Sequence, residues 1–348
     1  MYIDNTKRII ETLVSYKRNF NLSLEVSQLE PKIDGAIISS LTFDLRRNES
    51  LFRDWVKQEL SFSDEEYRAS FFPLKQIHST EFLSNPFLKN ISIDHISSGN
   101  IQLYKDYFKQ NEFVIYDEPL LSKQLINCYS LGNFDDNAYT YVLRDDKQVW
   151  MSINPMEMNT AYKAILDAHG KVLVLGGGLG YVPYMMSLKG NVESITIIES
   201  NHDIKKILES HILPQFKNSK VSIIEDDAFQ YMDYISKNHI EYDMIFIDIW
   251  PDNIEGALNY KKFVKYENIF PNTLFHYWLE KSILNSYIIN IYQYFNAKQG
   301  TEDYQKFFRT VAPDIWDYLE KDQSRIRRPD QLDYYLSKDF AKKMLKNL

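Results

Sequence analysis

The sequence has few of the residues that usually carry covalent or metal chemistry. One cysteine, Cys128, occurs among 348 residues, so no disulfide can form within the chain, which fits a reducing compartment. The seven histidines show neither an H-E-x-x-H pattern nor a Cys/His cluster, and we therefore expect no metal site. No histidine lies near Cys128 in the sequence, so this thiol is more typical of a packed residue than of a nucleophile.

Long hydrophobic runs and dense basic clusters are also missing. No run of about 18 apolar residues occurs, which argues against a membrane span. The start Met-Tyr-Ile-Asp lacks the apolar region of a signal peptide, so we expect a cytoplasmic protein. The formal net charge is −8, and acids flank the densest basic group at Arg325, Arg327 and Arg328, so nucleic acid is a disfavoured partner. The oligomeric state is left open, with a homodimer as one expectation.

The first third of the chain predicts a mainly helical N-terminal domain over residues 1–112. Ser63, followed by three acids, is typical of a helix start. Residues 113–153 read as a strand-rich lead-in, because two apolar runs at 139–143 and 148–152 flank a polar turn and predict a β-hairpin.

From residue 154 the pattern changes to alternating helix and strand. A helix is predicted over 160–169, ending at Gly170. Helical segments separate four short apolar runs, so we predict an α/β fold with a Rossmann-like, doubly wound and mostly parallel sheet. The four runs are residues 171–175, 194–198, 221–224 and 243–247.

We assign residues 113–348 to a second domain. It consists of the lead-in, a cofactor-binding core at 154–255 and a part at 256–348. Strand signals fade after Pro251, so the last part is expected to be rich in helices and the final strands of the sheet are not placed.

A glycine loop follows the first of the four apolar runs. Glycine lets the backbone turn sharply and approach a ligand closely, which suits a nucleotide-like cofactor. The dinucleotide fingerprint G-x-G-x-x-G fails because its sixth position is Tyr181, and no Gly-Lys-Ser/Thr of a phosphate loop is present. The loop glycines are Gly176, Gly177, Gly178 and Gly180.

Acidic residues follow the next two strands. Glu199 can accept hydrogen bonds from two ribose hydroxyls. Asp226 and Asp227 can accept one from an adenine amino group, and Asp227 is the better candidate because the small Ala228 beside it leaves room for a flat ring. The alternatives are a solvated strand-end acid and an acidic turn.

Asp248 ends the fourth strand. Ligands of open α/β sheets bind outside the carboxyl ends of the strands, so Asp248 is expected to face a substrate and to accept a proton. Trp250 nearby can pack over a cationic or flat group. The alternative is a strand-end acid that caps the following helix.

Together these four elements resemble class I S-adenosylmethionine-dependent methyltransferases over about residues 155–255. Val172 to Gly180 matches the cofactor loop, Ile198-Glu199 the ribose position, Asp227-Ala228 the adenine position and Phe246-Ile247-Asp248 the acidic motif. The resemblance implies S-adenosylmethionine, or decarboxylated S-adenosylmethionine, as cofactor.

Within that superfamily the chain is similar to the spermidine synthase-like branch. The resemblance implies that Asp248 deprotonates an attacking amine. The chain departs from the branch at Pro251, where an Asp is usual, and the acid follows at Asp252. The Asp-Glu pair and Tyr-His-Glu cluster of the branch are also absent, and Glu157 and Tyr162 are the candidates to replace them.

Four functions stay open. The leading interpretation is a methyltransferase acting on a small cationic acceptor, with Glu157, Tyr162, Trp250, Asp252 and His276 as acceptor-binding candidates. The second is an aminopropyltransferase that uses the decarboxylated cofactor. The third is a non-catalytic protein that binds a cofactor or recruits a partner, and the fourth, a nicotinamide dehydrogenase, is weakened by Tyr181.

Overall fold

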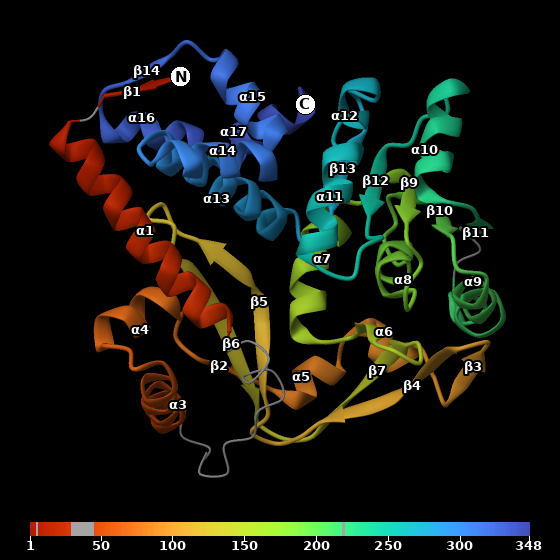
Figure 1. Cartoon of the computed structure of the whole chain (residues 1–348). Helices are drawn as coiled ribbons and strands as arrows, with labels where there is room; N and C mark the ends of the chain where they lie inside the picture. Colours follow the sequence, from red (N-terminus) through yellow and green to blue (C-terminus); the bar gives the residue numbers. More distant parts are fainter. Residues whose placement is uncertain (5, 29–44, 218–219) are drawn as a thin grey trace.

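A parallel sheet of five strands forms the α/β core of the molecule (Figure 1). The computed structural model describes residues 1–4, 6–28, 45–217 and 220–348. The strand order is β11-β10-β9-β12-β13, and every neighbouring pair is parallel. The order reverses direction between β9 and β12, which confirms the doubly wound, Rossmann-like prediction. The strands are β9 (Gly170–Leu175), β10 (Val192–Glu199), β11 (Val221–Glu225), β12 (Met244–Ile247) and β13 (Leu274–Tyr277).

The first four of these strands confirm the prediction, whereas β13 corrects it. This strand lies in the part expected to be helix-rich, and it pairs with β12 from Met244↔Leu274 to Ile247↔Tyr277. It is only 4 residues long and pairs with a distant partner, so no local repeat marks it in the sequence.

Helices cover both faces of the core sheet. Right-handed crossovers put α8 and α9 on one side as the chain steps from β9 to β11, and the return to β12 puts α10 on the other. Figure 1 shows this arrangement, with α12 on the side of α10. The helices are α8 (Tyr181–Ser187), α9 (His202–Ile207), α10 (Ala228–Lys237), α11 (Asn253–Phe263) and α12 (Tyr266–Ile269); a π-helical turn (Leu208–Ile212) and a 3-10 turn (Leu213–Gln215) extend α9.

Helix α7 (Pro155–Asp167) enters the core and starts earlier than predicted. Asn154 caps it by accepting a hydrogen bond from the Glu157 amide at 2.9 Å, and Pro155 occupies the first turn. The predicted start at residue 160 was wrong because the cap precedes the apolar repeat. The helix ends at Asp167, before Gly170. Gly170 is the first residue of β9 and has a φ of +59°.

Two smaller sheets precede the core. One has the order β2-β6-β5 and the other β3-β4-β7-β8. The antiparallel pairing of β7 with β8 confirms the predicted hairpin. The strands are β2 (Lys75–Ile77), β3 (Ile96–Ser98), β4 (Ile101–Phe108), β5 (Phe113–Leu121), β6 (Asn127–Phe134), β7 (Ala138–Arg144) and β8 (Val149–Ser152).

The predicted helical domain therefore contains strands as well as helices. β4 pairs with β7 along its whole length, from Gln102↔Arg144 to Phe108↔Ala138, across the expected boundary at residues 112/113. Ser63 is confirmed as a helix cap, since it forms a capping box with Glu66. The helices are α1 (Lys7–Ser27), α3 (Leu45–Leu60), α4 (Asp64–Ser70), α5 (Ser79–Leu83) and α6 (Pro86–Asn90). The division into domains stays a prediction.

The C-terminal part returns to the N-terminus. β1 (Tyr2–Ile3) pairs in parallel with β14 (Arg325–Ile326), so the N-terminal residues lie beside the strand that precedes α16 (Figure 1). None of the helices that the structure describes combines the length and hydropathy of a membrane span. The helices here are α13 (Glu280–Lys298), α14 (Glu302–Val311), α15 (Pro313–Lys321), α16 (Pro329–Tyr335) and α17 (Lys338–Lys346).

Candidate functional site

A cavity of about 280 Å³ lies at the carboxyl edge of the core sheet. Each of the four sequence-predicted elements contributes to its wall. The glycine loop follows β9, Glu199 ends β10, and aspartates follow β11 and β12. Strand polarity explains this convergence, because parallel strands bring their carboxyl ends to one edge. The contributing residues are Gly176, Gly178, Glu199, Asp226, Asp227, Ala228 and Asp248.

The glycine loop needs glycine for two separate reasons. Gly176, Gly178 and Gly180 have φ of +96, +47 and +78, a region that L side chains rarely adopt. At Gly176 an added Cβ would also lie 1.9 Å from the carbonyl oxygen of Asp248. The bare backbone of Gly176 therefore lets the loop after β12 lie directly against the loop after β9, which fixes Asp248 at the cavity.

Glu199 joins the glycine loop to the end of β10. Its Oε2 accepts a hydrogen bond from the Gly177 amide at 2.8 Å, and its Oε1 accepts one from the Asn201 amide at 2.8 Å. Burial raises the pKa of this carboxyl, and the backbone N–H donors oppose the rise. Each carboxylate oxygen has a further lone pair, so Glu199 can still accept hydrogen bonds from a ligand.

The two aspartates after β11 differ in their hydrogen-bond partners. Asp227 caps α10, since its Oδ1 accepts hydrogen bonds from the amides of Phe229 at 2.9 Å and Gln230 at 3.0 Å. The Oδ1 of Asp226 accepts only from the adjacent Asp227 amide, at 2.8 Å, among the interactions of the described residues. Both line the cavity beside Ala228. Asp226 is therefore the freer of the two carboxylates, whereas the sequence favoured Asp227.

Asp248 and Glu157 form the acidic centre of the cavity. Burial raises the pKa of Asp248 to about 7, and the nearby charge of Glu199 adds to the rise. Burial raises the pKa of Glu157 as well, the charge of Asp248 adds to it, and a hydrogen bond from the Trp278 side chain opposes it. These two acids therefore hold their protons more tightly than exposed carboxyls do, because ionising neighbouring acids together is unfavourable.

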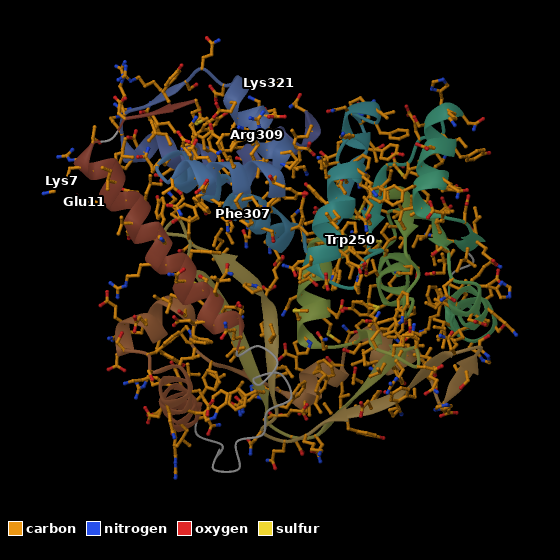
Figure 2. The ribbon with its side chains drawn as sticks, in the orientation of Figure 1. Lys7, Glu11, Trp250, Phe307, Arg309 and Lys321 are labelled. Carbon is orange, nitrogen blue, oxygen red and sulfur yellow. The ribbon has the colours of Figure 1, made fainter. Side chains whose placement is uncertain are left out.

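Two tryptophans close one side of the cavity. Trp250 is buried, and its indole N–H donates to the Trp278 carbonyl at 3.2 Å. The Trp278 indole donates in turn to Thr160 Oγ1 at 3.1 Å, which ties the wall to α7. Figure 2 shows Trp250 beside α11. Trp250 thus lines the cavity as part of a wall that hydrogen bonds hold in place.

Three predicted acceptor-binding residues lie elsewhere. Tyr162 is 62% exposed and does not line the cavity. His276 Nε2 lies 3.0 Å from the Oδ2 of Asp167, which is the last residue of α7. Asp252 caps α11 through the amides of Ile254 and Glu255, and it lines a second, neighbouring cavity. Of the five candidates, Glu157 and Trp250 are the two that the cavity brings together.

Sequence reasoning missed several residues of the wall. They come from the hairpin, from α10, from α11 and from the segment after β13, and their only sequence signal is a place next to a predicted element. The missed residues are Trp150, Met151, Phe229, Asn259 and Trp278.

The charged side chains that line the cavity are all acidic. None of the described residues that line it is Lys, Arg or His, whereas Glu157, Glu199, Asp226, Asp227 and Asp248 all do. The described residues contain no group of three or more His, Cys, Asp or Glu side chains that could hold a metal ion. The wall therefore suits an organic cation better than a phosphate-bearing ligand.

Comparison with known proteins finds partial similarities to adenosyl-dependent transferases. No family model matches the chain. A polyamine aminopropyltransferase of Leptospira interrogans is 33% identical over 120 residues, which cover 33% of this chain and 22% of the relative. The match thus spans about a fifth of the relative's length.

Two solved structures show a partial similarity. A protein from Streptococcus mutans assigned as an S-adenosylmethionine-dependent methyltransferase is 15% identical, with a TM-score of 0.30 over 41% of this chain and 43% of that one. A spermidine synthase in complex with the transition-state analogue AdoDATO is 15% identical, with a TM-score of 0.32 over 56% and 61%. These proteins are of the kind that the sequence motifs resemble. The assignment of the fold rests on the strand order of the core sheet.

Proposed function

We propose that this protein is a transferase that binds S-adenosylmethionine or its decarboxylated form and transfers a group from the sulfur to a small cationic acceptor. One observation carries the proposal: a Rossmann-like sheet edge lined by five carboxylates, with no basic side chain among the described lining residues. A sulfonium is a cation and gains from such a wall, whereas the phosphates of a dinucleotide would be repelled by it.

The residues of the wall divide into two groups by position. Glu199, held under the glycine loop, is placed to accept hydrogen bonds from ribose hydroxyls, and Asp226 beside Ala228 from an adenine amino group. Glu157 and Asp248 lie together and face the remaining space. They are the groups that would meet the sulfonium and the acceptor.

Asp248 is the candidate base. A pKa of about 7 leaves enough carboxylate at neutral pH to take a proton from an acceptor nitrogen. The bound sulfonium supplies an activated carbon–sulfur bond, whose electron pair passes to sulfur as the acceptor nitrogen bonds to the carbon. The protein mainly aligns donor and acceptor, and Asp248 receives the proton that the new C–N bond releases.

Two group transfers fit this site. Methyl transfer from S-adenosylmethionine requires only that the protein align the donor with the acceptor. Aminopropyl transfer is favoured by a specific observation: the described lining offers no Lys or Arg for the carboxylate of S-adenosylmethionine, and the decarboxylated donor has none. The similarity to an aminopropyltransferase points the same way.

Isothermal titration calorimetry with the two donors and with NAD⁺ tests the proposal. We expect both sulfonium compounds to bind and NAD⁺ not to bind. Glu199→Gln should weaken donor binding by at least about tenfold, whereas Glu209→Gln, which changes an exposed partner of Lys205, should not. Failure of both donors to bind at millimolar concentration would refute the proposal.

The same titrations separate the candidate reactions. A preference for the decarboxylated donor of about tenfold or more indicates aminopropyl transfer, and equal or tighter binding of the parent compound indicates methyl transfer. Donor binding without turnover on a pool of amines would favour the non-catalytic alternative.

A further inference from the structure

A second cavity of about 540 Å³ adjoins the first. It lies where α1, β5, β6 and α13 meet the loop after β12. Pro251 and Trp278 line both cavities, so these side chains form a shared wall. The hydrogen bonds of Trp278 to Trp250 and Thr160 hold that wall in place. A molecule in the second cavity would therefore lie next to the transfer site.

Two amide side chains of this cavity have an unused acceptor. Asn285 is 5% exposed, and its Nδ2 donates to the Pro119 carbonyl at 3.4 Å, which directs its Oδ1 away from that contact. This Oδ1 has no hydrogen-bond partner among the described residues, and the buried Oδ1 of Asn127 has none either. An unpaired buried acceptor costs free energy, which a ligand N–H would recover.

The charged residues around the cavity determine which ligand charge it favours. Glu118 is buried, and its Oε2 accepts hydrogen bonds from the amide and hydroxyl of Ser282 at 3.0 and 2.9 Å. Lys281 lies 3.4 Å from its Oε1, on the exposed side. No Lys, Arg or His occurs among the described lining residues. The cavity therefore accepts hydrogen bonds, and a carboxylate or phosphate would find little compensation there.

Most of the remaining lining is apolar. Several elements contribute these side chains, so the apolar surface surrounds the amides on more than one side. The main contributors are Phe20, Leu24, Ile115, Met156, Leu279 and Ile289. A chain or ring of carbon atoms gains free energy by leaving water for such a surface.

We propose that the second cavity is a binding site for a largely apolar primary amine, whose ammonium group donates to the amide oxygens of Asn285 and Asn127. This site differs from the transfer cavity in its elements and in its chemistry, since amide oxygens and apolar side chains predominate in its lining, beside the two carboxylates of Glu118 and Asp252. Its role as a holding site for the acceptor rests on the proposed function; its amine binding does not.

Calorimetry of the full chain with n-hexylamine tests the proposal, with n-hexanoate as a probe of equal length and opposite charge. Hexylamine should bind with one-to-one stoichiometry and at least tenfold more tightly than hexanoate. Asn285→Leu should weaken hexylamine binding by about tenfold or more, because the hydrogen-bond acceptor is lost. Asn296→Leu, a control on the same helix outside the cavity lining, should leave it unchanged.

Two further measurements guard against a folding defect. Asn285→Leu should unfold within a few degrees of the wild type, since the loss of the 3.4 Å hydrogen bond to the Pro119 carbonyl is offset by the removal of an unpaired buried oxygen. Ser286→Phe should block hexylamine by filling the cavity while both amides remain. Equal binding of amine and carboxylate, tighter binding of spermidine than of hexylamine, or full binding by both variants would overturn the proposal.

Methylthioadenosine binding separates this proposal from the proposed function. It reports on the first cavity and should be unchanged in Asn285→Leu and Ser286→Phe. Hexylamine binding without any adenosyl ligand binding would refute the transferase and support the amine site. Adenosyl binding without hexylamine binding would do the reverse.

Discussion

Asp248 couples the stability of the free protein to pH. Its pKa rises from 3.8 to about 7 on folding, so the stabilisation that its protonated form contributes is complete below about pH 4 and is lost as pH rises through 7. We predict that Asp248→Asn is more stable than the wild type at pH 8 by at least about 1 kcal/mol, since one pKa unit corresponds to about 1.4 kcal/mol. Urea unfolding at pH 5 and pH 8 measures this difference. A variant equally destabilised at both values would contradict the assignment.

Gly176 is the residue on which the geometry of the loop most depends. Gly176→Ala should destabilise the protein by more than about 2 kcal/mol, because the new Cβ meets the Asp248 carbonyl at 1.9 Å and φ is +96. Gly190→Ala is the matched control, since nothing lies within 4 Å of its added Cβ, and should change stability by less than about 0.5 kcal/mol. Thermal unfolding of the two variants decides the point. Equal stability of both would mean that the loop relaxes freely.

Individual site residues could be predicted where a local sequence pattern marks them. They could not be predicted where their role depends on the direction in which the side chain points. Glu199 and Asp248 lie at the carboxyl ends of apolar strands. The shared direction of the parallel strands alone therefore predicts that they meet at one edge of the sheet. Tyr162 was misplaced because it lies five residues after the buried Glu157, about 140° further around α7. His276 neighbours two buried aromatic residues on β13, but alternation points it to the other face, toward Asp167.

At the scale of the element, helix α10 distinguishes its two N-terminal aspartates. Asp227→Ala should cost about 1 kcal/mol, because two backbone amides lose the cap, whereas Asp227→Asn should retain most of the stability. Asp226→Ala should change stability by less than about 0.5 kcal/mol and weaken adenosyl binding, because its carboxylate faces the cavity. Chemical unfolding and calorimetry of these three variants test the division of work. A larger stability loss in Asp226→Ala than in Asp227→Ala would reverse the two roles.

Two of the pairings that the sequence missed join distant parts of the chain. β4 and β13 pair with β7 and β12, and no turn signal links them to those partners. The β7–β8 hairpin, whose partners are adjacent, was found, whereas β3, which pairs with the adjacent β4, was not. The second cavity is assembled from separate stretches of the chain between Phe20 and Ile289, so no local pattern marks it.

The described residues of the molecule form two hydrophobic cores that share strands. The smaller core contains Phe52 from α3 and Phe113 and Tyr129 from β5 and β6. The larger core contains Val114 and Phe134 from the same two strands. Side chains alternate between the faces of a strand, so β5 and β6 pack into both cores at once. The larger core also takes in both ends of the chain, from Met1 to Leu345.

We therefore predict that the chain unfolds in one cooperative transition, despite the boundary that its sequence suggests at residues 112/113. The reporter for the smaller core is Cys128, the one cysteine of the chain, which lies on β6 with its Sγ donating to the Ala69 carbonyl at 3.0 Å. Burial raises the pKa of this thiol, so it should react slowly in the folded protein. Pulsed thiol labelling across a urea series should follow the same curve as far-UV circular dichroism, because loss of the smaller core removes one face of the strands that support the larger one. Labelling that is complete at a urea concentration where the circular dichroism is still native would show that the cores unfold separately and that the boundary marks an independent domain.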